Sequence, residues 1–379
     1  MSPEVGAHAP SLRDRIAAFR NRIVASARFQ RFAAAFPLTR PIASRQAQAL
    51  FDLTAGFVYA QVLAACVRLD LFRLLEPAPR TAAALAPSLA MSEAAAERLL
   101  RAACALKLVE RRGQGRYGLA MLGAALAGNP GVGAMIAHHH RFYADLADPV
   151  ALLRGEAGVT ELSRFWAYAS SQDPAAAPAG DVAAYSALMA GSQHLVADDI
   201  VAAYDFRRHR RVLDIGGGEG AFLRVVARRA PSLHLAVFDL PAVAERARAC
   251  FAAAGLRHRA EAFGGDMHRD RLPGGADLVT LVRVLHDHDD AAVRALLTRV
   301  HAALPAGGAL LIAEPMAGSA ATARMADAYF GFYLLAMGSG RARTPAEITE
   351  LLGEAGFSTI RVLPTRRPML TGAIVARRD

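Results

Sequence analysis

The sequence predicts an α/β protein in which a helical N-terminal part precedes a mostly parallel sheet covered by helices. Two observations indicate this fold class. From Arg210 onward, short apolar runs alternate with helical stretches, as in parallel sheets whose strands are joined by crossover helices. Before that point the pattern is helical, except for a hairpin signal near residue 114. With 379 residues, 54% of them hydrophobic, the chain can form several domains.

The basic excess of the chain is concentrated near its N-terminus. The chain has 44 Lys+Arg against 34 Asp+Glu, a formal net charge of +10, and Lys107 is its only lysine. Residues 1–50 hold eight arginines and two acidic residues, which is +6 of this total. Such a cluster is compatible with a nucleic acid, with an anionic membrane surface, or with neither.

The cysteine content and the hydropathy pattern favour a cytoplasmic protein. Three widely spaced cysteines exclude a disulfide framework and a Cys-rich zinc module. Residues 1–14 contain no apolar stretch typical of a signal peptide. The longest apolar run, residues 55–67, has 13 residues, whereas a membrane span needs about 20. We therefore expect a cytoplasmic protein without a membrane-spanning helix.

Residues 1–47 are expected to form a basic amphipathic arm. Isoleucines and phenylalanines recur at helical spacing in a predicted helix over 13–36, and arginines lie between them. One interpretation is that the arm packs on a partner subunit while its arginines stay in solvent. The other is that a basic amphipathic helix rests on an anionic membrane. We expect Pro37 and Pro41 to end the helical pattern of the arm.

Residues 48–130 have the order of a winged helix. A long apolar helix is predicted over 46–67, and two shorter ones over 81–86 and 92–106, the last capped by Ser92. The turn at 113–115 then joins two strand-like runs. Such a domain either reads DNA or serves dimerisation. The last of these helices begins with acidic residues, which would repel phosphate, and with alanines, which offer no polar contact to a base. We therefore expect a homodimer and no nucleic-acid partner.

Residues 131–205 are expected to be a helical connector. The run His138-His139-His140 within it raises the question of a metal site. Adjacent residues do not share one face of a helix, and no carboxylate–histidine pattern surrounds the run. We therefore interpret the three histidines as structural and expect no metal.

Residues 206–379 are expected to form the sheet domain. Seven apolar runs qualify as strands, and helical stretches separate the first five. The connection between the last two is too short for a parallel crossover, so we expect an antiparallel hairpin to close the sheet. The pattern predicts a seven-stranded Rossmann-like sheet. The runs are 212–215, 233–238, 259–263, 278–284, 309–313, 359–363 and 372–376.

The first of these strands leads into a glycine-rich loop typical of nucleoside cofactor sites. Gly216, Gly218 and Ala221 satisfy the dinucleotide pattern G-x-G-x-x-G/A. With Asp214 and Gly220, the same glycines also satisfy the acidic-x-G-x-G-x-G pattern of enzymes that use S-adenosylmethionine (SAM). The carboxylate would repel a pyrophosphate but attract the cationic amino-acid tail and sulfonium of SAM. We therefore favour SAM as the cofactor.

Two further strand ends provide side chains for such a cofactor. Asp239 ends the next strand, where a carboxylate can bind ribose hydroxyls. Asp266 and Met267 follow the third strand, and they suit the amino group and the face of an adenine. Because parallel strands end at the same edge of a sheet, we expect these side chains to surround one ligand.

A candidate general base follows the fourth strand. His286 precedes Asp287, and Glu314 ends the neighbouring fifth strand. A carboxylate can orient a histidine and maintain its basicity, so that the imidazole removes a proton. An isolated His–Asp pair is more often a helix cap, but next to a cofactor loop we favour a catalytic role.

Taken in order, these motifs resemble those of the dimeric SAM-dependent O-methyltransferases of the caffeate type, over residues 48–379. The resemblance implies a winged-helix dimerisation domain, a connector that contributes to the substrate pocket, and a SAM-binding α/β domain that needs no metal. It rests on the glycine-rich loop and on Phe238-Asp239-Leu240-Pro241, Gly265-Asp266-Met267, Leu285-His286-Asp287 and Arg343-Thr344.

The resemblance, together with the motifs above, assigns roles to single residues. It implies His286 as the catalytic base, Glu314 as its orienting acid and Asp287 as a substrate-positioning carboxylate. The residues expected at the cofactor are Asp214, Gly216, Gly218, Gly220, Asp239, Leu240, Asp266, Met267, Arg283 and Ser192. The residues expected at the substrate are Tyr185, Met189, Tyr333 and Met337.

Three positions depart from the family pattern. Plant members carry a second acid before the Arg-Thr pair, where this chain has Ala342. An aromatic residue after His-Asp is replaced by His288, and a polar substrate contact falls on Met337. The first departure predicts a weaker two-acid clamp on His286. The last predicts a substrate with few polar groups.

A more specific resemblance includes the arm. Residues 28–31, 36–41, 49–53 and 283–290 are similar to the carotenoid O-methyltransferases of the demethylspheroidene type, which methylate a tertiary hydroxyl at carbon 1 of an acyclic carotenoid. The resemblance implies a hydroxylated carotenoid substrate and peripheral contact with the inner or photosynthetic membrane. Two alternatives stay open: an O-methyltransferase of an aromatic phenol or polyketide, and a SAM-binding winged-helix transcription regulator that would leave the His–Glu pair unused.

Overall fold

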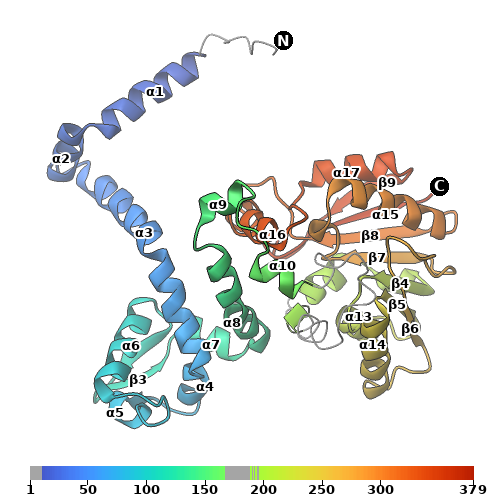
Figure 1. Cartoon of the computed structure of the whole chain (residues 1–379), viewed down its shortest axis with the longest axis horizontal. Coiled ribbons are helices and arrows are strands. Elements are labelled where there is room, and N and C mark those ends of the chain that lie inside the picture. Colours follow the sequence, from blue (N-terminus) through green and yellow to red (C-terminus); the bar gives the residue numbers. More distant parts are fainter. Residues whose placement is uncertain (1–10, 167–187, 190, 192, 194–195) are drawn as a thin grey trace. The chain divides into compact units, whose positions relative to one another are not determined.

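The computed structural model describes residues 11–166, 188, 189, 191, 193 and 196–379 (Figure 1). Tyr185 and Ser192, which were expected at the site, lie outside the described residues. The chain divides into two compact units, Met1–Ala124 and Ala125–Asp379. Each unit is described by itself below.

Two short helices and the first residues of a long one form the predicted arm, and the long helix continues beyond it to Arg68. Helix α1 (Leu12–Ala25) and α2 (Ala27–Ala35) are separated by Ser26, whose backbone is extended at ψ 121°. The prediction of one uninterrupted helix over 13–36 is therefore wrong. Helix α3 (Arg40–Arg68) also begins earlier than predicted. Pro41 lies in its first turn, where a missing N–H costs no hydrogen bond, so this proline starts the helix rather than preventing it.

The arm exposes most of its apolar side chains within this unit. No residue of α1 is buried, and α2 buries only Ala33. By length and composition alone, α3 could cross a membrane: an 18-residue window has a mean hydropathy of 1.7 and is 11% buried. The expectation that no helix is long enough is thus wrong, because α3 is longer than its uninterrupted apolar run. The exposed large apolar residues of the arm are Leu12, Ile16, Phe19, Ile23, Val24, Phe29, Phe32, Phe36, Leu38 and Ile42, and those of α3 beyond the arm are Leu50, Phe51, Leu53, Phe57 and Val58.

The rest of the first unit confirms the order of a winged helix. Its elements are α4 (Leu71–Leu75), β1 (Arg80–Thr81), α5 (Ala82–Leu85), α6 (Glu93–Ala105), β2 (Val109–Arg112), β3 (Arg116–Leu119) and α7 (Met121–Ala127), the last extending past its boundary. The strands form an antiparallel sheet in the order β1-β3-β2. Ser92 caps α6 as predicted, because its hydroxyl accepts a hydrogen bond from the backbone N–H of Ala95. Glu97 of α6 accepts a bond of 2.7 Å from the hydroxyl of Tyr117 and so ties this helix to β3.

The second unit contains the predicted seven-stranded sheet. Its order is β6-β5-β4-β7-β8-β10-β9. Five strands are parallel, and β10 pairs antiparallel with both β8 and β9, which confirms the predicted terminal hairpin. The strands are β4 (Arg211–Ile215), β5 (His234–Asp239), β6 (Ala260–Gly264), β7 (Leu278–Val282), β8 (Ala309–Glu314), β9 (Ser358–Leu363) and β10 (Gly372–Arg377).

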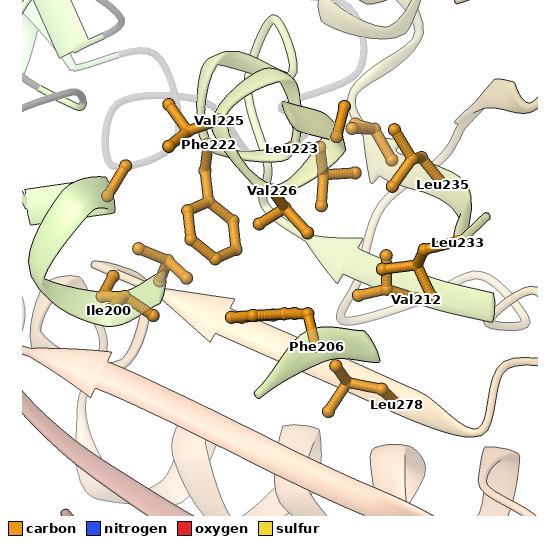
Figure 2. Packing of buried hydrophobic residues seen from close by; sticks show 14 of the residues in the cluster. Ile200, Phe206, Val212, Phe222, Leu223, Val225, Val226, Leu233, Leu235 and Leu278 are labelled. Atoms are coloured by element: carbon orange, nitrogen blue, oxygen red, sulfur yellow. The ribbon is translucent and has the colours of Figure 1, made fainter. Parts of the chain in front are cut away.

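Helices surround this sheet and bury both of its faces. Successive side chains of a strand point to opposite faces, and Val212 and Leu213 of β4 accordingly belong to two different core clusters. Figure 2 shows the first cluster, in which the rings of Phe206 and Phe222 meet edge to face at a centroid distance of 5.9 Å. Among the described helices of this unit, α8 (Pro130–Asp145), α9 (Pro149–Leu153), α10 (Glu161–Phe165), the π-helix η4 (Arg324–Phe330) and α16 (Gly331–Met337) pack on one another in a separate cluster. The others are η2 (Phe206–Arg208), α13 (Ala221–Arg229), α14 (Pro241–Ala253), η3 (Leu285–Asp287), α15 (Asp290–Ala303) and α17 (Pro345–Glu354).

Candidate active site

A cleft lies where the strand order reverses between β4 and β7, the position at which open α/β sheets bind ligands. It consists of two adjoining cavities of about 90 and 260 Å³, which share Gly216, Asp239, Met267 and His288. The structure therefore brings the predicted cofactor residues of three strand ends to one place. Predicted residues that line one or both cavities are Met189, Gly216, Gly218, Asp239, Leu240, Asp266, Met267, Arg283 and Asp287.

The glycine-rich loop requires glycine at two positions for different steric reasons. Gly216 has φ 68°, and a Cβ there would lie 2.8 Å from a methyl group of Val284. Gly220 has φ 71°, and a Cβ there would lie 2.5 Å from the ring of Phe251. A side chain at either position would combine a disfavoured backbone conformation with a clash. The loop can therefore turn tightly between β4 and α13 and expose its backbone to a ligand.

Asp214 lies beneath this loop rather than in the cavity wall. Its Oδ1 accepts a hydrogen bond of 2.6 Å from the hydroxyl of Thr280 in β7. Its Oδ2 is buried and has no hydrogen-bond partner among the residues that the structure describes. Burial raises the pKa of this carboxyl to about 7. A cationic group bound above the loop would favour the ionised form of this buried carboxyl.

Asp239 is oriented by the loop and by its own strand end. Its two oxygens accept hydrogen bonds from the backbone N–H groups of Gly218, at 2.8 Å, and Leu240, at 2.7 Å. A carboxylate fixed in this way keeps further lone pairs for the hydroxyls of a ribose. Asp266 is held similarly, since its Oδ1 accepts from the N–H of His268 at 2.8 Å. The adjacent Met267 lines both cavities and offers a polarizable apolar surface to a ring.

The candidate base is bracketed by two carboxylates. Nδ1 of His286 lies 2.5 Å from Oε2 of Glu314, and Nε2 lies 3.1 Å from Oδ1 of Asp287. The other oxygen of Glu314 accepts bonds of 2.9 and 2.8 Å from the N–H groups of Val284 and Leu285. Burial disfavours the imidazolium, but the charges of Asp287 and Glu314 outweigh this effect and raise the pKa of His286. Burial also raises the pKa of Asp287.

The second acid of this clamp comes from an unexpected position. Ala342 predicts a weaker clamp, because the family's usual second acid is missing there. In the structure Asp287, the residue next to His286, contacts Nε2 instead. This contact depends on the 3₁₀ turn of η3, which the sequence pattern does not reveal. The imidazole of His286 therefore lies between the carboxylates of Glu314 and Asp287, although position 342 carries no acid.

Arg343 fixes the loop that carries the base. Its guanidinium is buried and donates to the carbonyls of Leu285 and His288, each at 2.7 Å. It also forms an ion pair of 2.7 Å with Asp290. One side chain therefore holds both ends of the segment that contains His286. The sequence identified Arg343 only as part of a motif and missed Thr280. A hydroxyl within an otherwise apolar strand was the available signal for Thr280.

Two residues predicted to contact the substrate, Tyr333 and Met337, lie in an aromatic cluster next to His286. The phenol of Tyr333 is within 3.1 Å of Nε2 of His138, and Met337 is buried in the same cluster. Neither is among the residues that line the two cavities of the cleft. Phe330, which belongs to the cluster, places its ring centroid 5.6 Å from that of His286. The cluster therefore forms an apolar wall close to the base.

The histidine run is part of this wall. His138 contacts Tyr333, and Nε2 of His139 lies 2.7 Å from the hydroxyl of Tyr329. Burial lowers the pKa of His138 to about 4 and also lowers that of His139. Both imidazoles are therefore neutral near pH 7 and serve as hydrogen-bond partners of the two tyrosines.

Comparison with known proteins identifies the family. Residues 143–358 match an O-methyltransferase domain, and residues 51–129 match an O-methyltransferase dimerisation domain. The demethylspheroidene O-methyltransferase of Cereibacter sphaeroides is 46% identical over 94% of this chain and 94% of its own length. The chain belongs to the O-methyltransferase family. The enzyme of the same name from Rhodobacter capsulatus is 44% identical over 95% of this chain and 89% of its own length.

Structural comparison places this O-methyltransferase beside solved members of the family. Human N-acetylserotonin methyltransferase, solved in complex with SAM, aligns with a TM-score of 0.71 and 26% identity over 88% of this chain and 98% of that one. The match to a dimerisation domain agrees with the prediction that the winged helix serves dimerisation rather than DNA reading. The resemblance to O-methyltransferases and the expected two-domain fold are both confirmed.

Proposed function

We propose that this O-methyltransferase transfers the methyl group of SAM to the tertiary C1 hydroxyl of an acyclic hydroxycarotenoid. The observation that carries the substrate assignment is the identity of 46% and 44%, over nearly the whole chain, to two proteins named demethylspheroidene O-methyltransferase. The apolar, aromatic wall beside His286 agrees with a substrate that has few polar groups.

The described cleft suits SAM as the cofactor. Asp239 would accept the ribose hydroxyls, and Asp266 and Met267 would contact the adenine. The acidic side chain of Asp214 beneath the loop favours a cationic ligand over a pyrophosphate. When bound, SAM supplies a methyl group that is already electrophilic because it is attached to a sulfonium. The chain therefore mainly has to align the acceptor hydroxyl and remove its proton.

We assign the removal of that proton to His286, whose Nδ1 lies 2.5 Å from Oε2 of Glu314. During methyl transfer from SAM to the hydroxyl oxygen, the hydroxyl proton would pass to Nε2 of His286, and Glu314 would stabilise the resulting imidazolium. A tertiary alcohol hardly ionises in advance, so the proton must leave during the transfer. Since Nε2 faces Asp287 in the structure, the substrate hydroxyl has to replace this carboxylate as the partner of Nε2.

Parallel assays would test the substrate assignment. Methyl transfer from labelled SAM is measured with acyclic hydroxycarotenoids and with aromatic phenols under the same conditions. Transfer to the carotenoid alone supports the proposal. Transfer only to phenols favours the alternative of a phenol or polyketide methyltransferase. Salt-sensitive duplex binding without any methyl transfer would favour a transcription regulator and contradict both.

We further propose that the chain forms a homodimer through residues 51–129, which match an O-methyltransferase dimerisation domain.

We also propose that the arm docks on the surface of an anionic membrane. The arm combines exposed phenylalanines with eight arginines in residues 1–50, which suits an interface of acyl chains and anionic headgroups. Such docking would bring a cytoplasmic enzyme to a substrate dissolved in the bilayer. Deletion of residues 1–45 should impair liposome binding and carotenoid turnover but spare SAM affinity; unchanged liposome binding would refute the docking.

A further inference from the structure

A third cavity, of about 540 Å³, is separate from the cleft. It shares no lining residue with the two cavities described above. Its walls come from residues 201–205, from η2, from the last residue of α13 and from Arg361 and Leu363 of the edge strand β9. The activity proposed above uses none of these residues.

The lining of this cavity is strongly cationic. Four exposed arginines, Arg207, Arg208, Arg229 and Arg361, line it, and Asp205 is the one carboxylate among its lining residues, a formal excess of three positive charges. Asp205 is shared, because Nε of Arg207 lies 2.8 Å and Nε of Arg208 3.5 Å from its oxygens. Arg229 and Arg361 have no carboxylate within 4.0 Å in the described part of the chain. Two guanidinium groups at the cavity are thus available to an anion.

A fixed aromatic side chain forms part of the wall. The hydroxyl of Tyr204 is 2.7 Å from Nε2 of His209, whose Nδ1 is 3.2 Å from Oδ2 of Asp277. Asp277 in turn accepts hydrogen bonds from the backbone N–H groups of Arg210 and Arg211. The ring of Tyr204 stacks on that of His209 with a centroid distance of 5.7 Å. This chain of contacts holds Tyr204 in place, so the wall is preorganised.

We propose that this arginine-lined cavity is a binding site for a phosphate group. The planar fork of a guanidinium matches the oxygens of phosphate, and several guanidinium groups together suit a dianion. A phosphate monoester carries about −1.5 to −2 charges at pH 7, which balances most of the excess, whereas a single carboxylate does not. The phosphate group can belong to a soluble metabolite or to a lipid headgroup that is a phosphate monoester, such as that of phosphatidic acid, and the experiment distinguishes these sources.

The test compares two double variants of the full chain that lose the same charge. Arg229→Gln with Arg361→Gln removes the two available guanidinium groups of the cavity. Arg228→Gln with Arg366→Gln removes two exposed arginines that do not line it. Calorimetric titration with inorganic phosphate and with glycerol 1-phosphate should show at least about tenfold weaker binding for the first variant only, since hydrogen bonds to charged groups are strong.

Vesicles identify the source of the phosphate group. If binding to vesicles that contain phosphatidic acid is weaker for the cavity variant than for its control, the ligand is a lipid headgroup. If only the soluble phosphates lose affinity, the ligand is a soluble phosphate compound. Equal phosphate binding by the two variants, or none by the unmodified chain, would overturn the proposal. SAM affinity should be the same in both variants, so this outcome is independent of the methyltransferase assignment.

Discussion

Replacement of Asp287 by Asn tests the role of the second acid. The change keeps the shape of the side chain but removes the charge 3.1 Å from Nε2 of His286. At an effective dielectric constant of about 20, two opposite unit charges at this distance attract by about 5 kcal/mol. Burial of the imidazole offsets part of this attraction. The Asp287→Asn variant should therefore have a lower pKa at His286 than the unmodified enzyme.

This change in pKa has a defined sign in the pH–rate profile. A general base works only when it is neutral, so a raised pKa restricts activity to higher pH. In the Asp287→Asn variant the acidic limb of kcat/KM for methyl transfer should move to lower pH, even though loss of substrate positioning lowers the plateau. Asp289→Asn is the matched control. Asp289 is a nearby carboxylate of the same charge, but it is exposed, and its Oδ1 accepts a hydrogen bond from the backbone N–H of Gly340. An acidic limb that stays in place, or one that moves equally in both variants, would refute the reasoning.

Three further predictions concern the base and the glycine-rich loop. His286→Gln should reduce turnover on the order of 10²–10⁴-fold and leave SAM affinity unchanged; turnover near that of the unmodified enzyme would mean that positioning alone drives transfer. Thr280→Val removes the only described donor to the buried carboxylate beneath the loop and should cost about 1–3 kcal/mol of unfolding free energy in a urea titration, whereas the exposed Thr298→Val should cost far less. Gly220→Ala should lower both thermal stability and SAM affinity, because it adds a clash to a left-handed backbone. Gly275→Ala has a similar φ but open space around it, so an equal loss in both would show that the clash contributes nothing.

The main errors of sequence reasoning lie in the arm and at the base. The break at Ser26 and the helix start around Pro41 differ from the predicted boundaries, because a helix boundary depends on the backbone of single residues, which apolar spacing does not report. The weaker clamp inferred from Ala342 overlooked Asp287, because adjacency in sequence does not show which way two side chains point. Thr280 was missed because its partner is 66 residues away.

Local patterns in the amino-acid sequence predict the order of the strands along the chain, the terminal hairpin, the cap at Ser92 and the glycine-rich loop with its acids. These features are local: periodicity, turn residues and strand ends are properties of a few neighbouring residues. The packing of the elements adds that Asp287 also contacts the imidazole of His286, that Arg343 ties down the loop and that four arginines line one cavity. The first contact depends on the backbone turn of η3, and the others join residues from different elements, whose distances arise when the sheet and its helices pack together.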